Sequence, residues 1–190
     1  TMDELLSTNV ILVFGYIMEK NPVVQLKLKQ AAENGAKVYV INPVGVEVVN
    51  FDFAEKVIYT GNNLDALKEI AKYLVDEKDN LSLTNLLELK KSLENVFVSD
   101  EIKEVASAYN NAKKAMIVFQ ENVLSVDAAT MIGNIALVSN HIGAPRDGIV
   151  QIKGKNNSQG LVDMGIDKGI EEMANVKALL CFGEDPCVLG

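Results

Sequence analysis

Three short segments of the chain are apolar at almost every position. They are Val10–Phe14, Lys37–Ile41 (after its first residue) and Ala115–Phe119. A strand that helices cover on both faces has this continuous apolar pattern, whereas a half-exposed strand alternates apolar and polar residues. The three segments are therefore predicted to be buried strands of a parallel sheet.

A helical pattern separates the first two predicted strands. Asn21 can cap this helix, Pro22 suits its first position, and Gly35 is a typical stop signal. Val24 and Leu28 recur at helical spacing on one face. A strand, a helix and a second strand of this length imply a parallel pair joined by a right-handed crossover.

The alternation of strands and helices continues along the chain. Further strands are predicted at Lys56–Tyr59, Ile149–Ile152 and Lys177–Phe182. Further helices are predicted at Leu64–Leu74, Lys78–Asn95, Ile102–Tyr109 (with Ser99 as its cap) and Ala128–Ser139. This order predicts an α/β fold, a Rossmann-like open parallel sheet with helices on both faces.

Two regions of different character are expected. Residues 1–155 are expected to form the Rossmann-like α/β domain. Residues 156–190 are expected to be an Asn/Gly-rich segment and the start of an adjoining α/β unit. Because the chain stops at Gly190, just beyond the last predicted strand, we expect it to be a fragment of a longer polypeptide.

The acidic composition narrows the range of partners. A formal net charge of −8 and a pI near 4.7 disfavour binding to nucleic acid or to an anionic lipid surface. The longest apolar runs, such as Val10–Phe14, are far shorter than the ~20 residues of a membrane span. We therefore expect a cytoplasmic protein without direct membrane insertion, and a peripheral position on a membrane complex stays open.

The sequence offers few groups for catalysis or metal binding. Cys181 and Cys187 lack a standard metal spacing, and a phosphate loop, a nucleophile elbow and a zinc motif are all missing. The one histidine, His141, lies at a predicted helix end, where capping or packing is more common than catalysis. Glu184 and Asp185 are interpreted as turn residues before Pro186. No catalytic residue and no metal ligand are predicted.

One polar segment is more unusual. Asn156, Asn157 and Gln159 carry three amides between Gly154 and Gly160. Amides both donate and accept hydrogen bonds, and the flanking glycines allow close approach of the backbone, which suits a heterocycle with mixed hydrogen-bonding edges. A simple polar turn is the alternative, and composition alone does not decide between them.

The segment Val10–Pro43, VILVFGYIMEKNPVVQLKLKQAAENGAKVYVINP, resembles the Rossmann-like domain of molybdopterin oxidoreductases. Formate dehydrogenase catalytic subunits and the G subunit of NADH:quinone oxidoreductase (an NADH dehydrogenase) belong to that family. The resemblance continues through Thr60–Asn63, Ile142–Pro145 and Gly183–Pro186. Its most specific match is Asn156–Gly165. The motifs follow the family's order along nearly the whole chain.

In that family, loops at the strand ends hold the guanine dinucleotide part of a molybdopterin cofactor. The resemblance therefore implies a set of cofactor-binding candidates: Gly15, Asn42, Asn156, Asn157, Gln159, Gly160, Asp163, Gly183, Glu184 and Asp185. The family's iron–sulfur cysteines and its metal-binding Cys or selenocysteine lie upstream of this region. We therefore expect no cofactor to be held by this fragment alone.

Several positions depart from the family pattern. Ile17-Met18 replaces an Asn-Pro pair, Asn42 replaces an Asp, and Lys153 stands where formate dehydrogenases have an Arg. Gln120-Glu121-Asn122 replaces a Gly-x-Gly sequence and adds a negative charge where a pyrophosphate would approach. These departures favour an eroded cofactor site.

The leading hypothesis is a domain of a redox subunit resembling the G subunit of NADH:quinone oxidoreductase, which provides structure or electron-transfer context beside other domains and subunits of a redox complex. The alternative is a working domain that binds molybdopterin guanine dinucleotide in a formate-dehydrogenase-like enzyme. Two further alternatives are the central domain of a thiamine-diphosphate enzyme, which lacks the Asn-Asn-x-Gln-Gly segment, and a simple interaction module.

Overall fold

The computed structural model describes residues 2–15, 21–46, 51–78, 86–121, 124–154, 157–166, 177–178 and 180. The chain forms two compact units, Thr1–Gly154 and Lys155–Gly190. The described elements are η1 (Met2–Ser7), β1 (Val10–Phe14), α1 (Pro22–Glu33), β2 (Lys37–Pro43), β3 (Lys56–Thr60), α2 (Asn63–Asp76), α3 (Leu86–Ser92), α4 (Asp100–Asn110), β4 (Ala115–Gln120), α5 (Val126–Ser139), β5 (Gly148–Ile152) and α6 (Ser158–Asp163).

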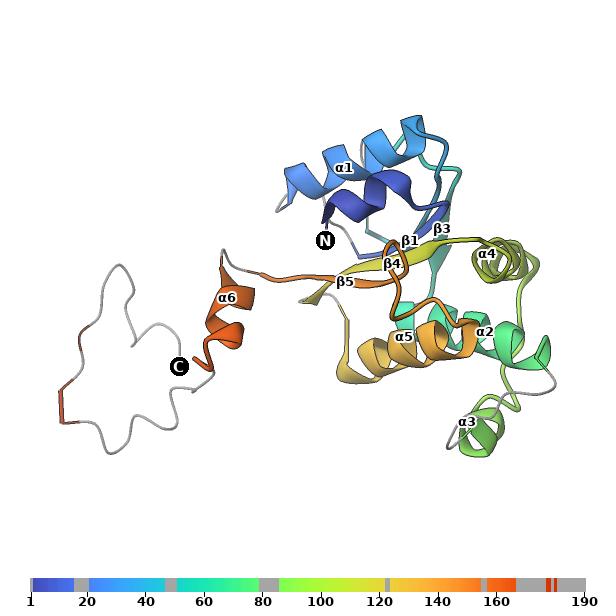
Figure 1. Cartoon of the computed structure of the whole chain (residues 1–190). Helices are drawn as coiled ribbons and strands as arrows, with labels where there is room; N and C mark the ends of the chain where they lie inside the picture. Colours follow the sequence, from blue (N-terminus) through green and yellow to red (C-terminus); the bar gives the residue numbers. More distant parts are fainter. Residues whose placement is uncertain are drawn as a thin grey trace. The chain divides into compact units, whose positions relative to one another are not determined.

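The first unit is built on a five-stranded sheet with the order β3-β2-β1-β4-β5 (Figure 1). Every neighbouring pair is parallel. The three strands predicted from continuous apolar runs are its central members, and every residue of β1 and β4 is buried. The predicted α/β open parallel sheet is therefore confirmed.

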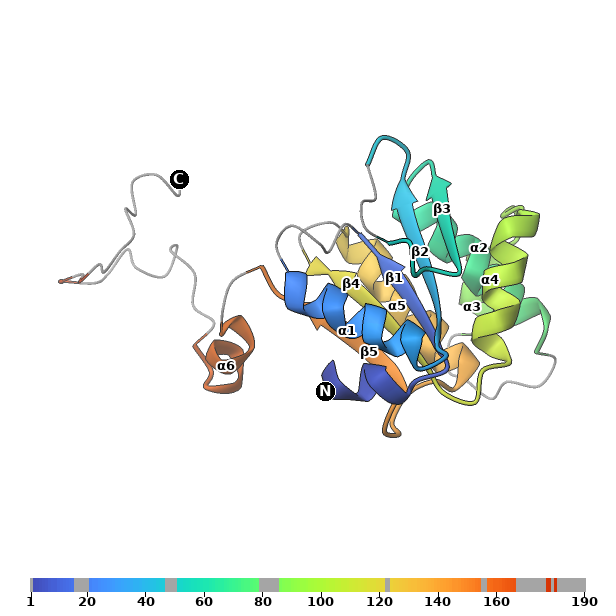
Figure 2. The same ribbon diagram turned by 90° about the horizontal axis from the view of Figure 1, so that it is seen from above.

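Helices cover both faces of the sheet. Figures 1 and 2 show η1 and α1 on one face and α2, α4 and α5 on the other. Alternate strand residues feed two separate cores, because successive side chains point to opposite faces. Leu12 and Ile117 belong to the core beneath α2, α4 and α5, whereas Val13 and Val118 belong to the core beneath α1. Burial on both faces explains the absence of alternation in the strand sequences.

Some local predictions were only partly right. The helix predicted over Lys78–Asn95 is the shorter α3, Leu86–Ser92, among the residues described. Ser99 precedes α4, but its side chain makes no capping hydrogen bond to that helix. Gly35 has a φ of +96°, a conformation that favours glycine, and it follows α1 as predicted.

Two predictions about the C-terminal region differ from the structure. The polar segment after Gly154 contains a short helix, α6 (Ser158–Asp163), which the sequence pattern did not predict. Lys177, Ala178 and Leu180 are not in a strand, and the other residues of the strand predicted at Lys177–Phe182 lie outside the described residues.

Candidate functional site

The strand order of the first unit reverses between β1 and β4. The chain builds the sheet outward from β1 to β2 and β3, then returns to the other side of β1 with β4 and β5. Ligands of open parallel sheets bind at the carboxyl ends of the strands, beside such a reversal. Phe14 pairs with Phe119, so Gly15, directly after β1, lies beside Gln120, the last residue of β4. Gly15 has a φ of +89°, which favours a residue without a side chain.

Asn42 is the most unusual polar residue of this edge. It lies near the carboxyl end of β2 and is only 1% exposed. Neither its side-chain oxygen nor its side-chain nitrogen has a hydrogen-bond partner among the described residues. A buried amide without partners costs roughly 1–3 kcal/mol, so such a group is rare unless a ligand or a further segment completes it. The residue thus points to a missing hydrogen-bonding partner.

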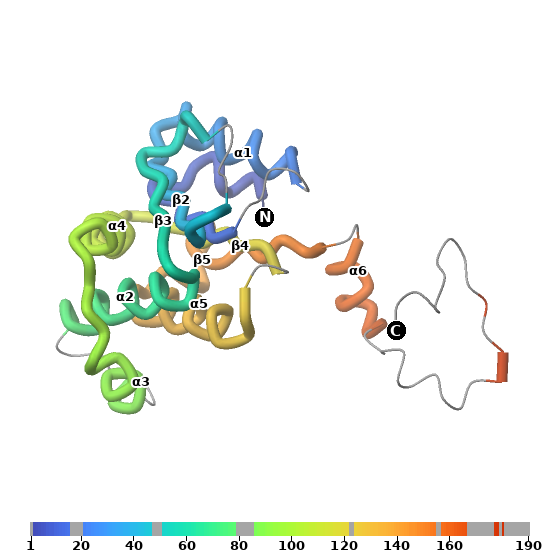
Figure 3. The backbone as a smooth tube through the Cα atoms, turned by 180° about the vertical axis from the view of Figure 1, so that it is seen from behind, coloured from blue at the N-terminus to red at the C-terminus, as the bar shows by residue number. Residues whose placement is uncertain are grey.

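A cavity of about 320 Å³ lies at the same edge, on the face of the sheet that α2 and α5 cover. The helices α2 and α5, which pack side by side in Figure 3, both begin at it. Its lining residues are Pro43, Asn62, Asn63, Leu64, Leu124, Ser125 and Ala128. Asn63 is 5% exposed, and its side-chain oxygen has no partner among the described residues.

The two helix starts at this cavity are already capped. The side-chain oxygen of Asn62 accepts the N–H of Asp65 at 2.8 Å, and the hydroxyl of Ser125 accepts the N–H of Ala128 at 3.2 Å. Asp65 and Asp127 also place negative charge in the first turns of α2 and α5. Because this charge offsets the positive ends of the helices, the cavity suits a neutral polar group better than a phosphate.

A charged cluster lies directly after the ends of β4 and β5. Glu121 comes directly after β4, and its Oε2 lies 3.3 Å from the Nζ of Lys153, which comes directly after β5. The amide of Gln151 donates to the same oxygen at 3.2 Å. Together, Gly15, Asn42, Asn63, Glu121 and Lys153 mark what is called the carboxyl-edge site below.

His141 lies at the opposite, amino end of the sheet. Its Nε2 donates to the backbone oxygen of Tyr109 at 2.9 Å, and its Nδ1 lies 3.1 Å from Asp147, directly before β5. The His141 side chain is 8% exposed and that of Asp147 is 7% exposed. This burial and distance from the carboxyl-edge site support the packing role expected for the histidine.

Four of the candidates implied by the family resemblance lie in the described part of the second unit. Asn157 has a left-handed conformation, with a φ of +59°, and precedes α6. The amide of Gln159 donates to Asp163 at 2.7 Å within that helix. A Cβ at Gly160 would collide with the side chain of Asn157, which explains a glycine at this position. Asn156, Gly183, Glu184 and Asp185 lie outside the described residues.

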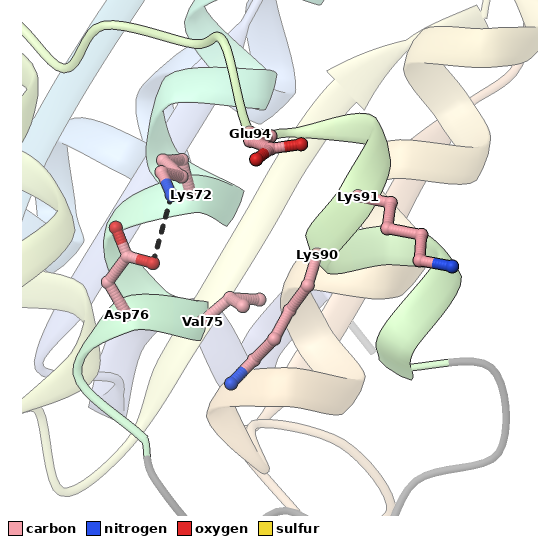
Figure 4. A pocket seen from close by; sticks show the side chains of 6 residues that line it. All are labelled: Lys72, Val75, Asp76, Lys90, Lys91 and Glu94. Atoms are coloured by element: carbon pink, nitrogen blue, oxygen red, sulfur yellow. Dashed lines mark hydrogen bonds and ion pairs between the residues drawn. The ribbon is translucent and has the colours of Figure 1, made fainter.

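A second cavity, of about 380 Å³, lies between α2 and α3 (Figure 4). On the α2 side of the cavity, the Nζ of Lys72 forms an ion pair with Asp76 at 3.1 Å. The side chain of Lys91 points away from Val75. The lining residues of the cavity are Lys72, Val75, Asp76, Lys90, Lys91 and Glu94. Because the lining side chains carry charges of both signs, they do not favour a ligand of either charge. The cavity also lies beside the last turns of α2, away from the carboxyl ends of the strands.

Metal-binding and membrane-spanning features were sought in the described part of the chain. It contains no group of three or more His, Cys, Asp or Glu residues that could hold a metal ion. No helix in the same part is both long and apolar enough to cross a membrane.

Comparison with known proteins identifies relatives of one kind. No protein-family model matches the chain. The chain is 25% identical over 186 residues to the F420-dependent formate dehydrogenase 2 subunit alpha of Methanococcus maripaludis. It is 25% identical over 185 residues to formate dehydrogenase H of Escherichia coli, and 26% identical over 187 residues to an F420-dependent formate dehydrogenase subunit alpha of Methanocaldococcus jannaschii. These relatives support the resemblance to molybdopterin oxidoreductases.

The match covers most of this chain but only a small part of each relative. It includes 86–87% of the chain and only 26–28% of the three relatives. A solved structure, acetylene hydratase from Pelobacter acetylenicus, matches 76% of the chain and 25% of that protein with a TM-score of 0.52. At 16% identity, this structural match supports the fold alone.

Only part of the carboxyl-edge site was named from the sequence. Gly15 and Asn42 were among the candidates that the family resemblance implies. The cavity at Asn63 was not predicted, because Thr60–Asn63 was matched to the family pattern without a binding role. The Glu121–Lys153 pair was also missed, although two charged residues directly after neighbouring parallel strands are a signal for such a contact.

Proposed function

We propose that this chain binds the nucleotide part of a molybdopterin guanine dinucleotide cofactor, as a domain of a formate-dehydrogenase-type oxidoreductase. The buried amide of Asn42, which has no hydrogen-bond partner among the described residues, carries the proposal, because a ligand edge that both donates and accepts would complete it. The formate dehydrogenase relatives and the parallel sheet with its reversal beside β1 support the same function.

The residues present suit the polar half of such a group. Asn42 would pair with a base or ribose edge, Gly15 would allow the backbone to approach closely, and the cavity at Asn63 would accept a neutral polar group. The segment with Asn156, Asn157, Gln159, Gly160 and Asp163 and the loop with Gly183, Glu184 and Asp185 stay candidates by resemblance. When bound, the cofactor supplies metal-centred redox chemistry, and this chain's residues hold and orient its nucleotide.

A calorimetric titration of the chain with GDP tests the proposal. We expect a dissociation constant of about 10 μM or tighter, near −7 kcal/mol. Asn42→Leu should weaken binding by about tenfold or more. Asn110→Leu is the control. Its side-chain oxygen also lacks a partner among the described residues, but Asn110 ends α4, away from the carboxyl ends of the strands. Equal affinities of wild type and Asn42→Leu would refute the role of Asn42.

A retained fold with an eroded site is the second candidate function. It would provide structure beside the other domains and subunits of a cytoplasmic redox complex, and resemblance to the G subunit of NADH:quinone oxidoreductase would favour it. The charge of Glu121 beside β4 supports it, because a carboxylate repels phosphate. GDP that fails to bind would favour this candidate. Pterin and molybdenum analysis of the complete parent protein would separate the two.

A further inference from the structure

Tyr59, in the edge strand β3, lies directly beside Asn42 in β2. Figure 2 shows the two strands side by side, and their register pairs the Cα atoms of these two residues near the carboxyl ends of both strands. Residues paired in this way send their side chains to the same face of the sheet. Val40 and Val57, two positions earlier in each strand, belong to the core beneath α1. Both side chains therefore leave the sheet on the α1 face.

Exposed apolar surface borders a buried amide at this point. Asn42 is 1% exposed, and neither polar atom of its side chain has a hydrogen-bond partner among the described residues. Tyr59 is 49% exposed. Val44, which directly follows β2 and donates its N–H to the oxygen of Thr60 at 2.8 Å, is 73% exposed.

A planar heterocycle fits both features. Its edge donates and accepts hydrogen bonds, as the amide of Asn42 requires, and its faces stack on aromatic rings. A tyrosine ring suits this contact, because it is large and loses little conformational entropy when it is fixed. A fully ionised phosphate only accepts hydrogen bonds and has no flat face, so it fits neither feature.

We propose that Tyr59 is the stacking platform for the base of the bound nucleotide. Its ring covers one face of the base, and the amide of Asn42 pairs with the edge of the same base. Tyr59 is not among the candidates that the family resemblance implies, and it adds a specificity-determining residue to the carboxyl-edge site. The inference rests on the proposed function, because it concerns the same ligand.

Calorimetry on the whole 190-residue chain tests the inference, with GDP as the probe. Tyr59→Phe keeps the ring and should bind GDP within about twofold of the wild type. Tyr59→Leu keeps apolar bulk but removes the aromatic face, and it should weaken GDP binding by about five- to fiftyfold.

Tyr73, in the last turn of α2, provides the matched control. It is partly buried against the core beneath α2, and it lies away from the carboxyl ends of the strands. Tyr73→Leu makes the same chemical change as Tyr59→Leu, so a general effect of losing a tyrosine ring appears in it too. It should leave GDP affinity unchanged within about twofold, because distant sites act independently.

NMR of the chain with isotope-labelled tyrosines gives a second readout. The Tyr59 ring signals are assigned from their absence in Tyr59→Phe, and a stacked base should shift them upfield when GDP is added. A tyrosine that only stabilises the strand does not show this shift. Because the measurement uses the wild-type ring, it decides the inference even where Tyr59→Leu fails to fold.

The outcomes separate the inference from its basis. If the wild type binds GDP but the Tyr59 signals do not move, or if Tyr59→Leu binds as tightly as the wild type, the inference is overturned and the proposed function stands. Equal losses in Tyr59→Phe and Tyr59→Leu, or in Tyr73→Leu and Tyr59→Leu, overturn it as well. Absence of GDP binding to the wild type and to every variant overturns both the inference and the proposed function.

Discussion

The carboxylate of Glu69, in α2, accepts two hydrogen bonds from Ser99, the residue before α4. The N–H of Ser99 donates at 2.9 Å and its hydroxyl at 2.8 Å, both to the same oxygen. Because the hydroxyl is committed to Glu69, it does not cap its own helix. The contact joins two helices that lie on the same face of the sheet and share one core.

Removal of this carboxylate should destabilise the chain. Glu69→Ala is expected to lower the free energy of unfolding by about 1–2 kcal/mol, because two donors lose their acceptor. Glu69→Gln keeps an acceptor oxygen and should cost less. Urea denaturation measures both changes. Glu33→Ala, an exposed glutamate at the end of α1, is the control, and an equal loss in the two alanine variants would contradict the prediction.

Asp147 should make the free energy of unfolding of the first unit depend on pH in the acidic range. It accepts the N–H of Ala115 at 2.9 Å and the Nζ of Lys114 at 2.6 Å, besides its contact with His141. Burial by itself would raise the pKa of Asp147, but its contacts with Lys114, Ala115 and His141 outweigh this effect, and the pKa is lowered overall. A depressed pKa in the folded state means stability that is present above the unfolded pKa and lost as the pH falls through the folded one.

The expected change for Asp147→Asn is a loss of about 2–4 kcal/mol at neutral pH, because Lys114 and His141 lose a buried anion. The variant should also lose less of its remaining stability than the wild type between about pH 5 and pH 2. Unfolding curves across this range measure both effects. Asp100→Asn, whose side chain is 96% exposed, should behave like the wild type, and an unchanged acid response in Asp147→Asn would rule out this role for Asp147.

Asn42 should limit stability when no ligand is bound. Asn42→Leu replaces a buried amide that has no partner in the described part of the chain with an apolar group of similar size, and we expect the free energy of unfolding to rise by about 1 kcal/mol. Asn42→Asp should lower it, because burial of a charge without a partner is unfavourable. Thermal denaturation of the two variants compares them directly. A destabilised Asn42→Leu would mean that the amide has a partner in the folded chain.

Two substitutions distinguish the contribution of the Asn157 backbone conformation to ligand binding from that of its side-chain amide. Asn157→Gly keeps the left-handed conformation at no steric cost, whereas Asn157→Ala strains it by roughly 1 kcal/mol. If the amide binds the ligand, both variants should lose GDP affinity equally. If only the backbone conformation matters, Asn157→Gly should bind like the wild type. Paired titrations distinguish these cases, and unchanged binding in both variants would remove Asn157 from the candidates.

Much of the fold was predictable because burial on both faces leaves a strong signal. Val10–Phe14 and Ala115–Phe119 are apolar throughout, and the structure confirms them as central parallel strands. Leu86–Ser92 gave a weaker signal, because the periodic pattern of Lys78–Asn95 did not mark where the helix begins and ends. None of its residues is fully buried, so packing does not fix those bounds in the sequence.

The candidate site was less predictable than the strands. Asn42 was named from the family resemblance, but the sequence does not reveal that both of its polar atoms are buried without partners among the residues described. The Glu69–Ser99 contact joins residues 30 positions apart, and no local pattern encodes it. Contacts of this kind depend on how helices pack over the sheet, which composition and periodicity leave open.

The sheet order also sets the sequence of events in folding. The first half, β1 to β3, can pair as soon as it is synthesised, but the other edge of β1 must wait for β4. The side chain of Asn9 accepts the N–H of Lys114, 105 residues later, at 3.1 Å, where that pairing begins. Closing so long a loop is entropically slow. Until it closes, the wholly apolar β1 leaves an open edge, so refolding should be slow and prone to aggregation at high protein concentration.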